Sequence, residues 1–282
     1  MNRAVSFVFA LAGSAIIGSC STHSEAGSGG ADGPPRSRPA AATAPPQLSL
    51  ASLATLPTSP AESAGAASSP CPDGMVLVDG EYCTEVRQIC AQWEDPPGTP
   101  LARCAKFAPS ECVGRRVHKR VCVDRDEYVP PGEALPAGDV SWNDANATCR
   151  AQRKRLCQES EWELACEGEQ MFPYTTGYER DPGACNFDRS HLADPKTGKL
   201  RDLRLPAGQL ERCTSPFGVR NMSGNLDEWV VRDRTPGPWH SALKGGWWTA
   251  ARERCRPATT AHGETFHELQ TGMRCCADPA AD

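Results

Sequence analysis

Three side chains near the C-terminus have the chemistry of a metal site. His262, Glu264 and His267 would supply two imidazoles and one carboxylate, the ligand set of non-haem iron centres. Their spacing is not diagnostic, and nothing in the pattern requires a helix there. We therefore keep two other interpretations, a polar loop held by hydrogen bonds and a surface that contacts a ligand.

The usual enzyme motifs are missing from the sequence. It has no phosphate-binding loop, no GxSxG turn, no HExxH pair and no dinucleotide fingerprint. Carboxylates are plentiful, but spacing alone nominates no acid–base pair. The net charge of -5 argues against a dedicated nucleic-acid binder, so we expect no nucleic-acid partner.

Cysteine is unusually frequent. The chain has 15 cysteines, and all except Cys20 lie between Cys71 and Cys276. The remaining even number suits complete pairing, which persists in oxidising compartments and contributes about 2 to 4 kcal/mol per bridge. No CxxC pair indicates a zinc ribbon or a thioredoxin-type motif. We predict structural disulfides of unassigned connectivity, with the adjacent Cys275 and Cys276 bonded to different partners.

Cys20 ends a pattern typical of a secretory signal. A basic Arg3 precedes an uncharged apolar run, and Ile17-Gly18-Ser19-Cys20 resembles a bacterial lipobox, in which the cysteine carries lipid after cleavage. An ordinary cleaved signal is the alternative. We predict a signal peptide at 1–19, membrane attachment through lipid on Cys20, and a location in the bacterial cell envelope, facing the periplasm or the outer membrane.

Composition divides the rest of the chain. Residues 20–70 are rich in Ala, Ser, Pro, Gly and Thr, cannot bury enough apolar surface to fold, and are predicted to be a disordered, lipid-anchored tether. Residues 71–120 are the Cys-rich N-terminal part of a domain, 121–277 are its main part, and 278–282 are a tail. About 200 residues are enough for one core.

The N-terminal part shows little periodicity. Met75–Val78 is a short apolar run, and Asp79-Gly80 is a turn dipeptide that predicts a hairpin. Residues 88–120 show no sustained period. We predict a loop-rich insertion there, fastened by Cys90, Cys104 and Cys112.

Two short helices are predicted further on. The first follows Ser141, which forms a capping-box pattern with Asp144. The second is expected to begin at Ser160, with Glu163 as its capping partner, and to end at Gly168.

Several motifs resemble one known family. They are Asn221-Met222-Ser223-Gly224-Asn225-Leu226-Asp227-Glu228-Trp229, Leu243-Lys244-Gly245-Gly246-Trp247-Trp248, Gly272-Met273-Arg274-Cys275, Val140-Ser141-Trp142-Asn143-Asp144-Ala145 and the segment from Glu159 to Gly168. These segments are similar to the formylglycine-generating, or sulfatase-modifying factor, family over roughly Val121 to Cys276. The resemblance implies an α+β fold, an irregular, loop-rich variant of the C-type-lectin fold, here stabilised by disulfides.

The resemblance also implies calcium, which prefers oxygen ligands. One site would use the side chains of Asn221 and Glu228 and the carbonyl groups of Gly224 and Leu226. A second site would use Asn186, Phe187 and Asp202, with Asp188 and Asp194 as alternatives to Asp202.

The oxidising chemistry of the family is only partly retained. Its oxidases bind copper through two cysteines, which correspond here to Ala250 and Cys255. Three neighbouring family positions, a histidine, a serine and a tryptophan, correspond to Ala251, Trp247 and Asp227. Copper(I) needs at least two thiolates, so Cys255 is a lone candidate catalytic residue, and we expect neither copper nor iron.

Two functions remain open from the sequence. The first is a binding or divergent family member whose ligand is a peptide, a protein or a glycan. The second is an oxidase that acts on a cysteine or another thiol, with the family reaction or with iron. Four tryptophans, Trp229, Trp239, Trp247 and Trp248, are expected in the core or, alternatively, stacked on a ligand.

Overall fold

The computed structural model describes residues 69–281. The predicted signal peptide, Cys20 and almost all of the predicted tether therefore lie outside the described residues. Within that range, neither helix is long and apolar enough to span a bilayer.

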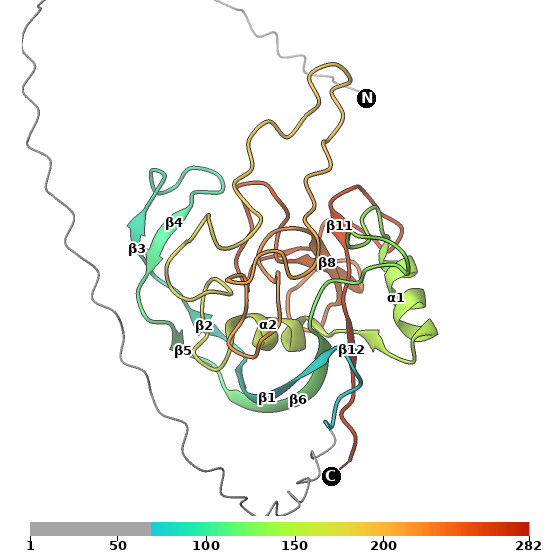
Figure 1. The fold of residues 1–282 in the computed structure, drawn as a ribbon. Helices are drawn as coiled ribbons and strands as arrows, with labels where there is room; N and C mark the ends of the chain where they lie inside the picture. The colour runs from blue at the N-terminus through green and yellow to red at the C-terminus, as the bar shows by residue number, and fades with distance from the viewer. Residues whose placement is uncertain (1–68, 282) are drawn as a thin grey trace, which may run out of the picture. The chain divides into compact units, whose positions relative to one another are not determined.

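Two four-stranded sheets frame the domain (Figure 1). The first is antiparallel and has the order β1 (Met75–Cys83), β6 (Arg116–Asp124), β12 (Cys275–Ala277), β7 (Arg155–Leu156). The second has the order β10 (Ala258–Thr259), β9 (Ser241–Lys244), β8 (Asp227–Val231), β11 (Thr271–Gly272), and only its β8–β11 pair is parallel. Chain ends far apart in sequence thus meet in one sheet.

The predicted hairpin at Asp79-Gly80 is wrong. Strand β1 continues through both residues and pairs with β6, so that Gly80 lies opposite Lys119. Burial alternates along this part of the strand, with Val78, Gly80 and Tyr82 buried and Asp79 exposed, which is the period of a half-buried strand. The distant partner strand overrides the local turn preference.

The expected loop-rich insertion is instead built from short strands. β3 (Cys90–Trp93) pairs with β4 (Cys104–Phe107), and β2 (Val86–Arg87) pairs with β5 (Glu111–Cys112). Strands of two to four residues are too short to show a period in the sequence. The expected fastening is confirmed, since disulfides link Cys90 to Cys104 and Cys83 to Cys112.

Both helices are present, and one cap differs from the prediction. Helix α1 (Trp142–Ala151) begins as expected, with the Ser141 hydroxyl accepting from the Asp144 N–H at 3.1 Å. Helix α2 (Glu159–Glu167) begins after Gln158, whose N–H donates to Glu161 at 2.8 Å. Ser160 lies inside the helix and donates to Asp233 instead. Gly168 ends α2 with a φ of 64°, as predicted.

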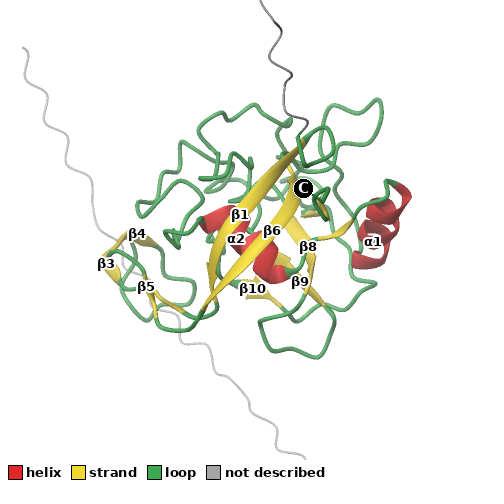
Figure 2. Cartoon of the chain, turned by 90° about the horizontal axis from the view of Figure 1, so that it is seen from below, coloured by secondary structure: helices red, strands yellow, loops and turns green. Residues whose placement is uncertain are grey.

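Helix α2 lies between the two sheets, in contact with β1, β6 and β8 (Figure 2). All nine of its residues are buried, four glutamates among them. A buried carboxylate must be paired, and each one is: Glu161 with Arg155, Glu167 with Arg256, Glu159 with Thr235, and Glu163 with Lys244.

Glu163 is the centre of this network. It accepts from Tyr82 at 2.6 Å, Lys244 at 2.7 Å and Arg234 at 2.8 Å, and lies 3.3 Å from Arg256. Burial alone would raise the pKa of Glu163, but the three cations outweigh it and lower the pKa. Glu163 is therefore held as a carboxylate inside the core.

All fourteen cysteines from Cys71 onward form disulfides. The pairs are Cys71–Cys122, Cys83–Cys112, Cys90–Cys104, Cys149–Cys275, Cys157–Cys276, Cys166–Cys255 and Cys185–Cys213. The prediction that Cys275 and Cys276 have different partners is confirmed.

The buried network predicts a large effect of removing its lysine. We expect Lys244→Met to lower the free energy of unfolding by about 3 kcal/mol, because it leaves Glu163 and Glu159 short of a cation in the core. Urea unfolding under non-reducing conditions measures this change. The control, Lys196→Met at an exposed position, should change the value by less than about 0.5 kcal/mol. Equal effects of the two variants would contradict the assigned role of the network.

Candidate functional site

The segment from Thr249 to Ala258 occupies the place where the family resemblance puts its copper cysteines. Ala250 has no ligand atom, and Cys255 is bonded to Cys166 of α2 with an S–S distance of 2.01 Å. Both sulfurs are fully buried. In this disulfide the Cys255 sulfur is no thiolate, so the segment offers neither a thiolate pair nor a single free thiolate.

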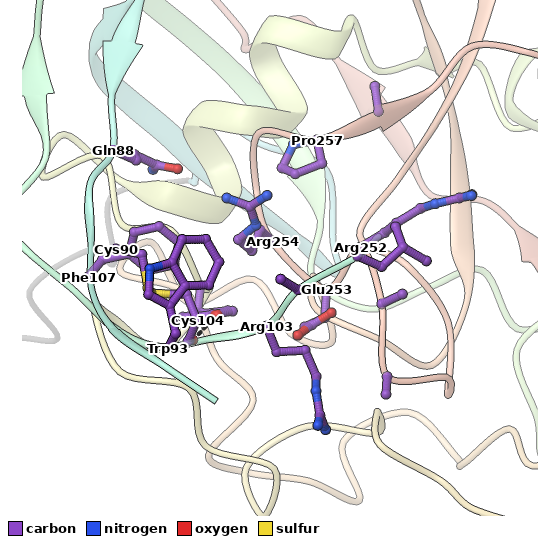
Figure 3. A pocket seen from close by; sticks show the side chains of 16 residues that line it. Gln88, Cys90, Trp93, Arg103, Cys104, Phe107, Arg252, Glu253, Arg254 and Pro257 are labelled. Carbon is purple, nitrogen blue, oxygen red and sulfur yellow. Dashed lines mark hydrogen bonds between the residues drawn. A yellow bond between two sulfur atoms is a disulfide. The ribbon is translucent and has the colours of Figure 1, made fainter. Parts of the chain in front are cut away.

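This segment forms one wall of a groove, and the β3–β4 hairpin forms the other (Figure 3). The larger cavity between them has a volume of about 360 Å³. Trp93, Phe107, Arg254 and Pro257 are among the residues that line it, so aromatic and basic groups face the same space. Leu101 and Arg252 line both this cavity and the next one.

Both walls of the groove are tied to the core. The Cys90–Cys104 disulfide closes the hairpin, and the Tyr174 hydroxyl donates to the Cys104 carbonyl at 2.5 Å. On the other side, the Cys255 N–H donates to the Pro173 carbonyl at 2.9 Å. A rigid groove needs little ordering when a ligand binds.

A second cavity, of about 320 Å³, contains a buried acid. Asp227 is among its lining residues and accepts a hydrogen bond from the Gly246 N–H at 3.0 Å. Burial raises the pKa of Asp227 to about 7, although the positive charge of Arg252 opposes the shift. Close to neutral pH this carboxyl therefore exchanges between an anion and a neutral acid.

The three candidate iron ligands, His262, Glu264 and His267, make separate contacts in the structure. The His262 ring stacks on Phe266 at 3.7 Å, Glu264 accepts from the His240 N–H at 2.8 Å, and His267 pairs with Asp139 at 2.9 Å. The three side chains thus have separate partners. Across residues 69–281, no group of three or more His, Cys, Asp or Glu side chains is placed to hold a metal ion. The interpretation as a polar, hydrogen-bonded loop fits these contacts.

The first expected calcium set is buried and extends from the segment 221–226 into the start of β8. Asn221 and Glu228 are both buried, and Glu228 receives hydrogen bonds from Arg274 at 2.6 Å and Trp162 at 2.7 Å. Asn221 donates to the Glu127 carboxylate at 3.2 Å. The other oxygen of that carboxylate, Glu127 Oε1, is buried without a hydrogen-bond partner. Burial, followed by the charge of Glu228, raises the pKa of Glu127 to about 8.

The Gly224 carbonyl of this set has an internal contact as well. The Gly224 carbonyl accepts from the Leu226 N–H at 2.9 Å. Gly224 itself has a φ of +78° and lies so close to the Asn186 backbone that a Cβ there would come within 2.4 Å of the Asn186 carbonyl oxygen. Only glycine fits this position.

In the second expected calcium set, arginine side chains already bind the side-chain oxygens of Asn186 and Asp202. The Asn186 side-chain oxygen accepts from Arg189 at 2.7 Å, and Asp202 forms an ion pair with Arg204 at 2.6 Å. Phe187 packs in a buried cluster beside the Cys185–Cys213 disulfide. Asp188 is bound by Arg180, and Asp194 accepts from Thr197 at 2.8 Å. Guanidinium groups already supply the positive charge beside Asn186 and Asp202.

Of the four tryptophans expected in the core or stacked on a ligand, two are in the core and two are not. Trp229 and Trp248 are core residues, Trp247 is half-buried in the second cavity, and Trp239 is exposed. The tryptophan that lines the larger cavity is Trp93. No sequence motif marks it, nor Arg252, Arg254 and Leu101 beside it. Only its place between Cys90 and Cys104 could have drawn attention to Trp93.

Asp227 predicts a pH dependence of stability. Its folded pKa of about 7 exceeds the value of about 3.9 in an unfolded chain. The stability associated with its protonated form is therefore fully present below about pH 4 and is lost as the pH rises through 7. We expect Asp227→Asn to be more stable than the wild type at pH 8.5, by roughly 2 to 4 kcal/mol, and to show no advantage at pH 4.

Thermal unfolding of both proteins across this pH range measures the difference. Asp202→Asn is the control of opposite sign, because Arg204 lowers the pKa of Asp202. A constant difference between Asp227→Asn and the wild type at every pH would refute the assignment.

The sequence was also compared with family models, curated proteins and solved structures. A family model described as the sulfatase-modifying factor enzyme 1-like domain matches residues 106–279. The mouse protein named inactive C-alpha-formylglycine-generating enzyme 2 is 30% identical over 156 residues, which cover 51% of this chain and 49% of that protein. A formylglycine-generating enzyme of Thermomonospora curvata is 28% identical over 172 residues, or 51% and 56% of the two chains.

The chain thus spans about half the length of the curated relatives it matches. Among solved structures, PvdO from Pseudomonas aeruginosa is 17% identical with a TM-score of 0.46, covering 77% of this chain and 100% of the other. The family match, the two helices among short strands and the seven disulfides confirm the predicted fold class, a disulfide-stabilised, loop-rich α+β variant of the C-type-lectin fold. The chain belongs to the sulfatase-modifying factor enzyme 1-like domain family.

Proposed function

We propose that this protein is a noncatalytic member of its family that binds a ligand in the groove between the β3–β4 hairpin and the segment from Thr249 to Ala258. One observation carries the proposal. Where copper would need two thiolates, the chain has Ala250 and a Cys255 that is buried in a disulfide with Cys166.

Two further observations support a binding role. The groove retains a cavity of about 360 Å³ lined by aromatic and basic side chains, with walls fixed by disulfides. A matching mouse relative is itself named inactive. A family domain that lacks the oxidising centre and keeps a rigid groove is suited to recognition.

Calcium is part of the proposal only at the first set. Asn221, Glu228 and the carbonyl groups of Gly224 and Leu226 are oxygen donors of the kind that calcium prefers. The unpartnered Glu127 Oε1 beside Asn221 adds one more oxygen. Arg274 pairs with Glu228 of the first set, so what distinguishes this set is the unpartnered Glu127 oxygen. In the second set, Arg189 and Arg204 bind the side-chain oxygens of Asn186 and Asp202.

We also propose that the chain is an envelope lipoprotein, anchored through lipid on Cys20 and held off the membrane by residues 21–70. The lipobox-like sequence and the number of cysteines support an oxidising compartment outside the cytosol. A membrane-anchored binding domain would present its groove to other envelope proteins or polymers.

The noncatalytic proposal predicts the thiol and metal content of the protein. The full chain, purified under oxidising conditions, should show no reactive thiol in denaturant and should retain no copper after incubation with Cu(I). The double variant Ala250→Cys with Cys166→Ser should gain two thiols and about one copper, because it frees Cys255 and restores its partner. Thiol titration and elemental analysis give both numbers. Stoichiometric copper in the wild type would overturn the proposal.

The same elemental analysis tests calcium. One calcium per chain is expected, reduced by Asn221→Ala and unaffected by Asp202→Asn.

The anchoring proposal predicts where a variant is found. Cys20→Ser should move the protein from the membrane fraction to the soluble fraction, measured by immunoblot after cell fractionation in its native or a bacterial host. Alkaline carbonate extraction separates lipid anchoring from peripheral adhesion. If Cys20→Ser remained with the membranes after carbonate, lipid on Cys20 would not be the anchor.

A further inference from the structure

Two arginines line the groove without an ion pair, although the charge of Arg252 also acts on the Asp227 carboxyl of the second cavity. Arg252 is exposed and donates to the Thr259 hydroxyl at 2.7 Å, and the half-buried Arg254 lies over the Phe107 ring at 5.5 Å. In the part of the chain that the structure describes, no carboxylate forms an ion pair with either of them. Both line the larger cavity, where Figure 3 shows Arg254 beside Pro257 and Trp93.

The other charges of the cavity are neutralised inside the protein. Glu253 is buried and pairs with Arg180 at 2.7 Å, and Arg103 pairs with Asp95 at 2.7 Å. The excess positive charge of the groove therefore comes from Arg252 and Arg254. Its effect reaches the second cavity, where the pKa of His262 is lowered by burial and by Arg252.

Apolar side chains stand beside these arginines. Trp93 is 43% exposed and Leu101 is 63% exposed, and both belong to the hairpin wall of the groove. Exposed apolar groups that gather at a groove are a feature of interaction sites. Basic groups from one wall of the groove and apolar groups from the other thus line the same cavity.

Two strand edges also lie at the groove. β10 is the edge strand of its sheet, and β3 has only β4 beside it. The two residues of β10 point into different cavities, since Ala258 lines the larger one and Thr259 the smaller one. An added strand would find backbone partners at such an edge and would place alternate side chains on opposite sides.

Resting on the proposed binding function, we propose that the groove binds an extended segment of another protein in which acidic side chains alternate with apolar ones. The acidic side chains pair with Arg252 and Arg254. The apolar side chains contact Trp93 and Leu101, and the backbone pairs with the edge of β10. A sugar polymer could stack on Trp93 but would leave the strand edge unused, so the geometry favours a peptide.

The test uses fluorescence anisotropy with labelled eight-residue probes. One probe alternates Glu with Leu, a second alternates Gln with Leu, and a third is an oligogalacturonate, an acidic sugar of matched charge. The full chain, oxidised, is compared with Arg252→Gln/Arg254→Gln and with Trp93→Ala. Arg115→Gln is the control, because Arg115 is exposed and lies outside both cavities. Thermal unfolding checks that each variant is folded.

We expect the wild type and Arg115→Gln to bind the Glu probe about tenfold more tightly than the Gln probe, with a preference that weakens as salt rises. The arginine double variant should lose this preference and keep the binding of the Gln probe. Trp93→Ala should weaken the binding of both peptides.

Three results would overturn the assignment. Equal binding of the Glu and Gln probes, abolished by Trp93→Ala, would leave the groove a binding site and remove the acidic class. Tighter binding of the oligogalacturonate than of the Glu probe would replace the peptide with a sugar. No binding of any probe by folded protein would refute the acidic peptide. None of these results decides whether the protein is noncatalytic, because that proposal is tested by the thiol and copper content of the protein.

Discussion

The buried glutamates of helix α2 constrain the whole domain. A charge taken out of water must be paired, and removing one partner of a buried pair typically costs 3 to 5 kcal/mol. Glu163 draws its partners from β1, β9 and two loops, through Tyr82, Lys244, Arg234 and Arg256. These segments can take few other positions without leaving a buried carboxylate unpaired. In a domain with little regular structure, the network fixes where the chain segments meet.

The groove wall is attached to the same helix. Cys166 of α2 is bonded to Cys255, and Arg256 next to it pairs with Glu167 of α2 and donates to the Cys83 carbonyl at 2.8 Å. Lys244 also donates to the Arg256 carbonyl at 2.8 Å. A position that would carry a reactive thiol in an oxidase of the family therefore serves here to anchor the wall. In the disulfide, Cys255 contributes rigidity to the wall and offers no thiolate.

The sequence predicted the features that local rules decide. The capping box at Ser141, the glycine end of α2 and the separate partners of Cys275 and Cys276 depend on a few neighbouring residues and are present. Features that depend on distant partners were missed. Asp79-Gly80 has the composition of a turn, but pairing with β6 keeps it extended. His262, Glu264 and His267 are close in sequence, and their separate contacts with Phe266, His240 and Asp139 appear only in three dimensions.

The two walls of the groove differ in origin. The wall from Thr249 to Ala258 lies within the family match, whereas β3 and Trp93 precede its start at residue 106. A two-stranded hairpin is marginal alone, and here the Cys90–Cys104 bridge and the packing of Phe107 on Tyr174 hold it in place. Trp93 and Leu101 are exposed and take no part in the α2 network, so in the proposed binding role changes at these positions would alter the ligand that fits while leaving that network intact. In the proposed binding role, the hairpin therefore carries residues that contact the ligand, while the buried charges that fix the core lie on α2.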